Sequence, residues 1–320
     1  MKNKILLISG DPNSINSEII FKSWKKLSSS KRKNIYIISN YNLLKKQFKI
    51  LKYPVKIIKV KSKSDHVNSD KLKILDIDLK FNNPFKVQHK NSSNFVKKML
   101  NMAHELALQK DVKGIVNCPI DKKLLSKNHM GVTEFLASKC KVKNDSEAML
   151  IFNKYLSISP ITTHVKIKDI ARKILSKNIV KKIETIDKWF KKNFKKQPKI
   201  GVLGLNPHNG ELRKNTEEKK VILPSINKLK KRGIKVKGPL VADTLFIDDY
   251  KNYNVIVGMY HDQVLAPYKT LFKFDAINIT LGLKYHRVSP DHGVATNILK
   301  KKTANHLSLL RCIEFLQNIK

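Results

Sequence analysis

Three histidines in this sequence share a setting that could place them around one metal ion. His164, His208 and His261 each follow a short run of apolar, β-favouring residues. Neutral imidazole is a common ligand of divalent metals, and three imidazoles leave a coordination position open, as in catalytic zinc sites. The three histidines are tens of residues apart, so no local motif joins them. The residues alone leave two interpretations open: a shared metal site, or three separately bonded histidines.

The residues after His261 indicate what such a site could do. A divalent ion bound to a substrate hydroxyl lowers the pKa of that hydroxyl, so the alkoxide needed for hydride departure forms near neutral pH. Lys269, Asn278 and Arg287 follow closely, and lysine and arginine are the usual partners of phosphate and carboxylate. Lysine is abundant throughout the chain, so Arg287 carries more weight than Lys269. The pattern favours oxidation of a small anionic hydroxy compound.

An α/β fold is predicted as the framework that positions these residues, because short apolar runs alternate with helical patterns. In an open α/β sheet, ligands gather at the carboxyl ends of the strands, which is where the three histidines are expected. A helix is expected from about Ser17, and Ser92 is expected to cap another whose apolar residues recur at helical spacing. The predicted strands are Ile5–Ile8, Ile35–Ile38, Val55–Val60, Gly114–Val116, Ile200–Leu205, Val255–Met259 and Ile277–Leu281.

The length and composition favour a globular protein. A chain of 320 residues with 41% hydrophobic residues suits one large α/β domain or two tightly associated lobes. Cys118, Cys140 and Cys312 form no CxxC pair, which favours a reducing compartment over a disulfide framework. The apolar run in Met1–Gly10 is too short for a signal peptide, and no stretch reaches the length of a membrane span. A cytoplasmic location is expected.

The charge is strongly positive, with 65 Lys and Arg against 25 Asp and Glu, a formal net charge of +40. A nucleic-acid or anionic-membrane binder is one interpretation, because clustered cations displace the counterions of phosphates. The lysines instead occur mostly singly or in pairs along the whole chain, without an RGG, RNP or zinc-finger pattern. We therefore expect a dispersed, solvated charge that attracts phosphorylated small molecules, with no specific nucleic acid and no membrane as partner.

Several segments, in the same order along the chain, resemble the 4-hydroxythreonine-4-phosphate dehydrogenase family. The resemblance runs from Ile5 nearly to the C-terminus and is specific because it combines several motifs. The segments that carry it are Pro160–Asp169 (PITTHVKIKD), Gly204–Gly210 (GLNPHNG), Gly238–Phe246 (GPLVADTLF), Met259–Gln263 (MYHDQ), Asn278–Leu283 (NITLGL) and Asp291–Gly293 (DHG).

This resemblance implies a three-layer α/β/α fold like that of isocitrate and isopropylmalate dehydrogenases, with two lobes and the active site in the cleft. The first lobe is expected to comprise 1–128 with about 290–320, and the second, about 129–289, to carry the metal ligands and dimer contacts. The roles that the resemblance assigns are metal binding for His164, His208 and His261, substrate binding for Thr133, Lys269, Asn278 and Arg287, and catalysis for Lys269 with Asp243 as a candidate support.

The resemblance also implies the reaction. The family uses NAD or NADP to oxidise 4-phosphooxy-L-threonine to 2-amino-3-oxo-4-phosphooxybutanoate. This product decarboxylates to 3-amino-2-oxopropyl phosphate in pyridoxine 5'-phosphate biosynthesis. One divalent ion per active site, Zn, Mg or Co, and a homodimer with the active site at the interface are implied as well. The family binds its dinucleotide without a Rossmann fingerprint, in agreement with the absence of GxGxxG after a strand here.

Two departures from the family pattern bear on the substrate. Val132 precedes Thr133 where the family has a histidine, and Ser14 and Asn16 replace two glycines in the early segment Gly10–Glu18. The segment Asn117–Lys122 is also a loose version of its counterpart. Two alternatives therefore stay open. One is a paralogue that oxidises another phosphorylated four-carbon acid, such as a threonate or erythronate phosphate. The other is a basic nucleic-acid-binding protein without catalysis.

Overall fold

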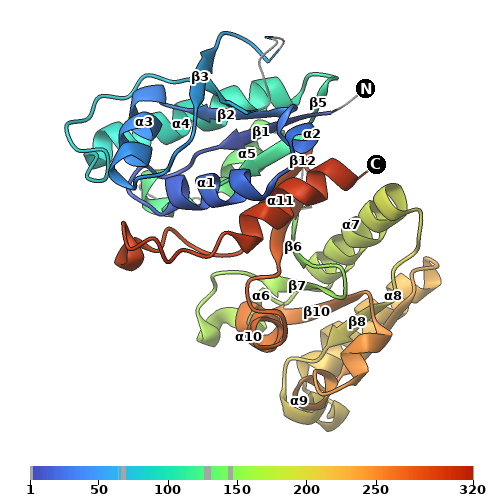
Figure 1. Ribbon diagram of the computed structural model, residues 1–320. Coiled ribbons are helices and arrows are strands. Elements are labelled where there is room, and N and C mark those ends of the chain that lie inside the picture. Colours follow the sequence, from blue (N-terminus) through green and yellow to red (C-terminus); the bar gives the residue numbers. More distant parts are fainter. Residues whose placement is uncertain (1–2, 64, 66–69, 126–130, 143–146, 320) are drawn as a thin grey trace. The chain divides into compact units, whose positions relative to one another are not determined.

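The computed structural model describes residues 3–63, 65, 70–125, 131–142 and 147–319 (Figure 1). The chain divides into two compact units, Met1–Lys141 with Leu283–Asn318 and Val142–Gly282 with Ile319–Lys320. Each unit has a sheet with helices packed against it, so the predicted α/β class is confirmed. No helix within the described ranges is both long and apolar enough to cross a membrane.

The first unit is built on six parallel strands in the order β3-β4-β2-β1-β5-β12. Parallel pairing requires a crossover between strands, and helices supply these crossovers. Its elements are β1 (Lys4–Ile8), α1 (Asn16–Lys26), α2 (Ser29–Arg32), β2 (Ile35–Ser39), α3 (Tyr41–Ile50), β3 (Ile57–Val60), β4 (Leu72–Asp76), α4 (His89–Ala107), β5 (Val112–Asn117), α5 (Val132–Lys139), β12 (His286–Pro290) and α11 (Leu307–Asn318).

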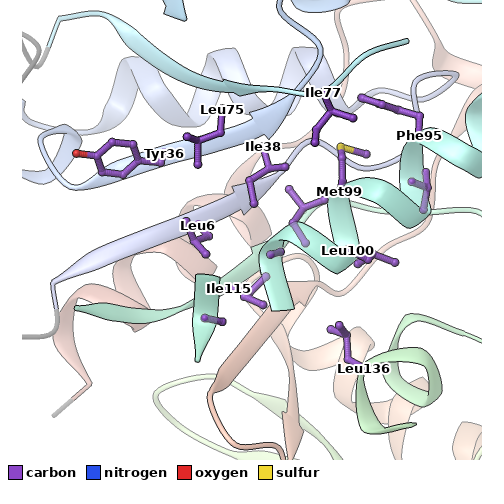
Figure 2. Packing of buried hydrophobic residues seen from close by; sticks show 14 of the residues in the cluster. Leu6, Tyr36, Ile38, Leu75, Ile77, Phe95, Met99, Leu100, Ile115 and Leu136 are labelled. Atoms are coloured by element: carbon purple, nitrogen blue, oxygen red, sulfur yellow. The ribbon is translucent and has the colours of Figure 1, made fainter. Parts of the chain in front are cut away.

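The core of the first unit forms where α4 covers one face of this sheet (Figure 2). Phe95, Met99 and Leu100 of α4 pack against strand residues such as Leu6 and Ile38, and all are nearly or fully buried. The opposite face is covered in part by α11, which contacts β5 and β12 and packs beside α1. The strands β1 and β2 are buried on both faces, which explains their continuous apolar runs in the sequence.

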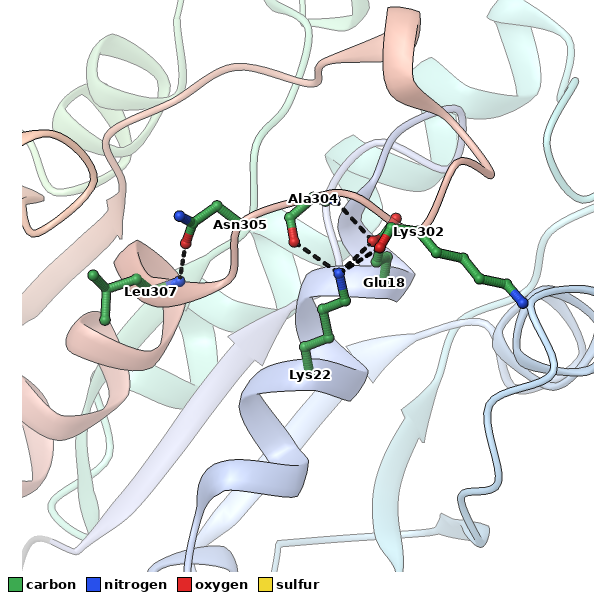
Figure 3. A network of polar contacts seen from close by, with 6 residues as sticks. All are labelled: Glu18, Lys22, Lys302, Ala304, Asn305 and Leu307. Atoms are coloured by element: carbon green, nitrogen blue, oxygen red, sulfur yellow. Dashed lines mark hydrogen bonds and ion pairs between the residues drawn. The ribbon is translucent and has the colours of Figure 1, made fainter.

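A buried ion pair ties α1 to the segment before α11 (Figure 3). The Glu18 carboxylate accepts from Lys22 Nζ at 2.7 Å and from the Ala304 amide at 2.9 Å. Lys22 Nζ also donates to the carbonyls of Lys302 and Ala304 at 2.8 and 2.9 Å. Because Glu18 is 1% exposed, removing one partner would leave a buried charge uncompensated. The network therefore fixes a segment that lies far from α1 in sequence.

The second unit has six strands in the order β11-β6-β7-β10-β8-β9. The pairs of β6 with β11 and β7 are antiparallel, whereas β7, β10, β8 and β9 are parallel. Its elements are β6 (Ala148–Phe152), β7 (Ser157–Thr162), α6 (Ile170–Lys173), α7 (Ser176–Phe194), β8 (Ile200–Leu203), α8 (Leu223–Lys231), β9 (Val236–Leu240), α9 (Ala242–Leu245), β10 (Val255–Tyr260), α10 (His261–Phe272) and β11 (Ile277–Leu281).

The core of the second unit places α10 on one face of its sheet. Val264, Leu265 and Tyr268 pack against Ile158 of β7 and Ile256 of β10. Helix α7 contacts β6, β7 and β11 and also packs against α8. The parallel strands β7, β10 and β8 are therefore held firmly, and their carboxyl ends lie side by side.

Two details differ from the sequence-based expectation. Ser92 does not cap α4, because the helix begins at His89 and Ser92 lies in its first turn. The Ser92 hydroxyl donates to the Val87 carbonyl at 3.4 Å. The apolar spacing marked the buried face of the helix and not its start. The unit boundaries lie at 141/142 and 282/283, where 128/129 and about 289/290 were expected. Leu136 of α5 belongs to the core of the first unit, and β12 pairs with β5.

A lysine is buried in the first unit. Lys73, on β4, is 1% exposed, and its ammonium donates to the Lys33 carbonyl and lies 4.2 Å from the centroid of the Tyr36 ring. Burial, together with the charges of Lys4 and Lys33, lowers the pKa of Lys73 from 10.5 to about 8. The folded state therefore pays a desolvation cost for this charge at neutral pH.

We expect Lys73→Met to stabilise the protein at pH 7 by about 1–2 kcal/mol, because the carbonyl and the ring already offset part of the desolvation. The folded pKa lies below the unfolded one, so the wild-type free energy of unfolding should rise with pH between about 8 and 10.5. That rise should be smaller in Lys73→Met. Urea unfolding at pH 7 and 9.5 measures both effects, with the half-exposed Lys71→Met as control. A destabilised Lys73→Met at pH 7 would contradict the prediction.

Candidate functional site

The three candidate histidines follow three neighbouring parallel strands. His164 lies two residues after β7, His208 follows β8, and His261 is the first residue of α10, directly after β10. The strands stand in the order β7-β10-β8 and run in the same direction. All three histidines therefore come from the carboxyl-end edge of one parallel sheet, as expected from the sequence.

Two of the histidines are close together. The ring centroids of His164 and His261 are 5.7 Å apart, and the rings are tilted by 33°. His261 Nδ1 lies 2.6 Å from Asp262 Oδ1. A carboxylate at Nδ1 favours a proton on that nitrogen and leaves the lone pair of Nε2 available, which is how metal-ligating histidines are usually oriented. The donor chemistry of this pair therefore suits a divalent ion.

His208 does not complete the set within one chain. In the part of the chain that the structure describes, no group of three or more His, Cys, Asp or Glu side chains could hold a metal ion. Of the three histidines, His164 and His261 lie close together, and the metal-binding role of all three stays a prediction.

The backbone at these positions is strained. His164 has φ 53°, and in the turn Pro207–Leu212 the residues His208, Asn209 and Glu211 have φ of 49°, 57° and 50°. Left-handed conformations cost a non-glycine residue roughly 1 kcal/mol or more, and they cluster at functional sites. Two of the three candidate ligands are therefore held in conformations that packing alone would not favour.

Buried polar bonds cross-link the strand ends that carry the histidines. Thr162 Oγ1, at the end of β7, donates to the Met259 carbonyl of β10 at 2.8 Å. The Gln263 side chain accepts from the Met259 amide at 2.7 Å and donates to the Gly204 carbonyl after β8 at 2.7 Å. These two side chains fix the ends of β7, β10 and β8 relative to one another.

Glu218 fixes the segment that leads to His208. One oxygen of this fully buried carboxylate accepts from the amides of Leu205 and Asn206 at 2.7 and 2.8 Å, and the other accepts from Asn206 Nδ2 at 2.9 Å. Burial raises the pKa of Glu218, but the bonds from Asn206 and Leu205 outweigh it and the net pKa is lowered. The carboxylate is therefore ionised at neutral pH and anchors this loop.

The other predicted residues of the second unit lie on separate elements. Lys269 is exposed on α10, eight residues after His261, which corresponds to about 12 Å along the helix. Asn278 is half-buried on β11, and its Oδ1 is buried without a hydrogen-bond partner among the described residues. Asp243 is exposed on α9, a helix that contacts the turn carrying His208. The three residues therefore lie on three different elements, α10, β11 and α9.

In the first unit, Arg287 and Thr133 are brought together. Arg287 Nη1 donates to Thr133 Oγ1 at 3.3 Å, and Arg287 Nε donates to Asn117 Oδ1 at 2.6 Å. Arg287 is 4% exposed, and burial lowers its pKa to about 10, so it stays protonated at neutral pH. The guanidinium joins β12 to the end of β5 and to the first turn of α5.

The structure also explains the departures from the family pattern. Ser14 Oγ donates to the Asp11 carbonyl at 2.6 Å, and Asn16 Nδ2 donates to the Pro119 carbonyl at 2.8 Å. The Ser14 bond lies within the β1–α1 loop, and the Asn16 bond ties this loop to the loop after β5. Val132, the first residue of α5, packs against the core cluster that contains Leu136. Its side chain therefore contributes to packing, a role that histidine fills less well.

Four residues that position these segments were not among the candidates drawn from the sequence: Asn117, Thr162, Glu218 and Gln263. Asn117, Thr162 and Gln263 lie in segments that the resemblance covers, beside residues that it singled out. Their partners, however, are backbone groups or side chains distant in sequence. Glu218 lies outside every motif, and only its burial reveals it.

Comparison with known proteins assigns the chain to a family. The sequence profile described as "Pyridoxal phosphate biosynthetic protein PdxA" matches residues 31–316. The chain belongs to this family. The resemblance to 4-hydroxythreonine-4-phosphate dehydrogenases is therefore confirmed.

Relatives of the PdxA family cover nearly the whole chain. The 4-hydroxythreonine-4-phosphate dehydrogenase of a Sulfurihydrogenibium species is 36% identical and covers 97% of this chain and 96% of its own. A relative from Oceanobacillus iheyensis, provisionally named D-threonate 4-phosphate dehydrogenase, is 33% identical over 95% of this chain and 94% of its own. The crystal structure of the Klebsiella pneumoniae 4-hydroxythreonine-4-phosphate dehydrogenase matches with a TM-score of 0.86 and 27% identity, covering 98% of both chains. These relatives support an oxidoreductase function.

Proposed function

We propose that this protein oxidises 4-phosphooxy-L-threonine with NAD or NADP, and that the product decarboxylates to 3-amino-2-oxopropyl phosphate in pyridoxine 5'-phosphate biosynthesis. The observation that carries the proposal is the paired His164 and His261 at the ends of neighbouring strands, with Asp262 on His261 Nδ1. The relative from Sulfurihydrogenibium, which aligns along nearly the whole chain, is named for this substrate.

Each group of residues has a role in this proposal. Arg287 positions Thr133 and supplies positive potential for an anionic substrate, and Asn278 offers its amide oxygen to a substrate donor. Lys269 is assigned to proton transfer or phosphate contact, with Asp243 in support. His164, His261 and His208 of the partner subunit would hold the divalent ion. When bound, this ion supplies the Lewis-acid chemistry that lowers the pKa of a hydroxyl.

The distribution of exposed apolar side chains supports a homodimer. Three large ones lie just beyond candidate site residues: Ile167 after His164, Leu212 after His208, and Ile247 after Asp243. Their exposures are 83%, 43% and 71%. A surface that a second chain covers would contain large apolar side chains of this kind. We propose that a second copy covers this surface and thereby brings its His208 to the pair that one chain leaves incomplete.

The test is coenzyme reduction, followed at 340 nm, on a panel of phosphorylated four-carbon hydroxy acids. The proposal expects 4-phosphooxy-L-threonine to have the highest kcat/KM and to require added divalent metal. Analytical ultracentrifugation of the same preparation tests the dimer. No coenzyme reduction with any panel member, in a folded and metal-loaded protein, would contradict the proposal.

A second candidate substrate is D-threonate 4-phosphate, favoured by Val132 and by the Oceanobacillus iheyensis relative. We expect Val132→His to change kcat/KM for 4-phosphooxy-L-threonine by less than about tenfold, because Thr133 and Arg287 already hold each other and a lysine can replace one charge-assisted bond. The variant should lose about 1 kcal/mol of stability through its core contact. A large gain on the threonine substrate with a loss on threonate would instead identify the protein as a threonate enzyme.

A further inference from the structure

The first unit contains a hollow that the proposed function does not use. It has a volume of about 510 Å³ and lies between one face of α3, the turn after it, and the edge strand β3. The size lies within the range of small-molecule sites. It belongs to different elements from Thr133, Arg287 and the histidine segments.

The floor of the hollow is apolar and aromatic. Phe48 is 3% exposed, and the Tyr53 ring stacks on Phe21 with centroids 4.2 Å apart and an interplanar angle of 7°. Ile57 and Ile58 of β3 extend this surface, and Tyr41 borders it. A rigid surface of this kind can bind a planar or apolar group without a large loss of side-chain entropy.

The rim of the hollow is uniformly positive. Four lysines border it, Lys45 and Lys49 from α3, Lys56 before β3, and Lys71 before β4. No carboxylate lines the hollow, and no described Asp or Glu forms an ion pair with any of the four. Four like charges around one concave, low-dielectric surface raise its positive potential, which an anion with several charges would relieve.

The high lysine content of the chain does not account for this composition by itself. A second hollow, of about 390 Å³, lies in the other unit and is lined by Lys199, Lys235 and Lys237. That hollow also includes the carboxylate of Asp249 and offers Tyr253 as its only aromatic residue. The α3–β3 hollow differs because its cations are not balanced and several aromatic residues form its surface.

We propose that the α3–β3 hollow binds a nucleoside triphosphate, with the phosphates on the lysine rim and the base on the aromatic floor. A triphosphate carries several negative charges for the four lysines, and a purine or pyrimidine is a planar group that stacks on tyrosine. The site is separate from the dehydrogenase residues, so the proposal is independent of the function proposed above.

Isothermal titration calorimetry of the full-length protein with metal-free ATP, tripolyphosphate and adenosine tests the proposal at about 150 mM salt, where nonspecific charge attraction is screened. ATP should bind at least about tenfold more tightly than adenosine and measurably more tightly than tripolyphosphate, because both rim and floor contribute. Saturating NAD should leave ATP binding unchanged. No ATP binding, equal affinity for tripolyphosphate, or displacement by NAD would overturn the proposal.

A matched pair of variants locates the site. Lys45→Glu/Lys49→Glu should weaken ATP binding by about tenfold or more, whereas Lys235→Glu/Lys237→Glu, with the same change in net charge, should change it less than about threefold. Circular dichroism and thermal unfolding check that both variants are folded. Lys45→Gln/Lys49→Gln, which introduces no negative charge, serves as a second test if the first variant is unstable. Equal weakening in both hollows would show that only the overall charge attracts ATP.

Discussion

Removal of divalent metal is expected to lower the rate of coenzyme reduction by roughly 10²–10³-fold, because a Lewis acid contributes several kcal/mol to stabilising developing negative charge. The fold should persist, since the cores of both units are built from buried apolar side chains that are not metal ligands. Chelation with EDTA, followed by activity and far-ultraviolet circular dichroism, measures both effects. Activity should return when Zn²⁺, Mg²⁺ or Co²⁺ is added back.

Single substitutions locate the metal. His164→Ala, His208→Ala and His261→Ala should each lose activity and bound metal together, whereas the exposed His89→Ala should retain both. If His208 is supplied by a second subunit, a mixture of His208→Ala and His261→Ala chains should recover part of the activity in mixed dimers. Full activity in a strong chelator would exclude the metal mechanism.

Arg287→Met is expected to lower kcat/KM by roughly 10²-fold, because each lost hydrogen bond to a charged group costs about 1.5–3 kcal/mol. The same change leaves Asn117 Oδ1 without its donor at 2.6 Å, so stability should also fall. Arg287→Lys retains the charge, but a single ammonium does not reproduce the fork that reaches both Asn117 and Thr133. Arg287→Lys should therefore recover only part of the activity.

The matched control is Arg311→Met on α11, whose guanidinium is paired with Glu314 at the surface. Exposed ion pairs contribute little to stability, so this variant should behave like the wild type in both assays. Steady-state kinetics and urea unfolding of the three variants separate a catalytic loss from a general loss of folding. Wild-type kcat/KM in a folded Arg287→Met would remove Arg287 from the site.

The elements that carry the histidines could be predicted from the sequence because their signals are local. The apolar runs form β7, β8 and β10, and polar residues follow the end of each strand. The carboxyl-end rule for parallel strands then places His164, His208 and His261 at one edge of a sheet. The strand Ile277–Leu281 was predicted with the bounds that the structure shows.

What the sequence could not provide is the long-range pairing. Glu218 and Gln263 act through backbone amides and carbonyls that no side-chain pattern marks. The start of α4 was misplaced because the apolar spacing reports a buried face, and Ser92 resembles a cap wherever it stands. Lys269 and His261 are close in sequence, but eight residues of helix separate them by about 12 Å along the axis of α10. Proximity in sequence alone therefore did not show that they are apart.

The backbone is left-handed at His164 and His208. At these two positions, the residue that best stabilises the fold therefore differs from the residue that the proposed activity requires. Glycine adopts φ near 50° without a steric penalty, so His164→Gly and His208→Gly should leave a protein at least as stable as one with alanine there. Selection for stability alone would therefore drift toward residues that abolish the proposed chemistry. The proposed metal-binding role would account for histidine at both positions despite this cost. A stabilised form of this protein should accordingly be sought in substitutions outside these two turns.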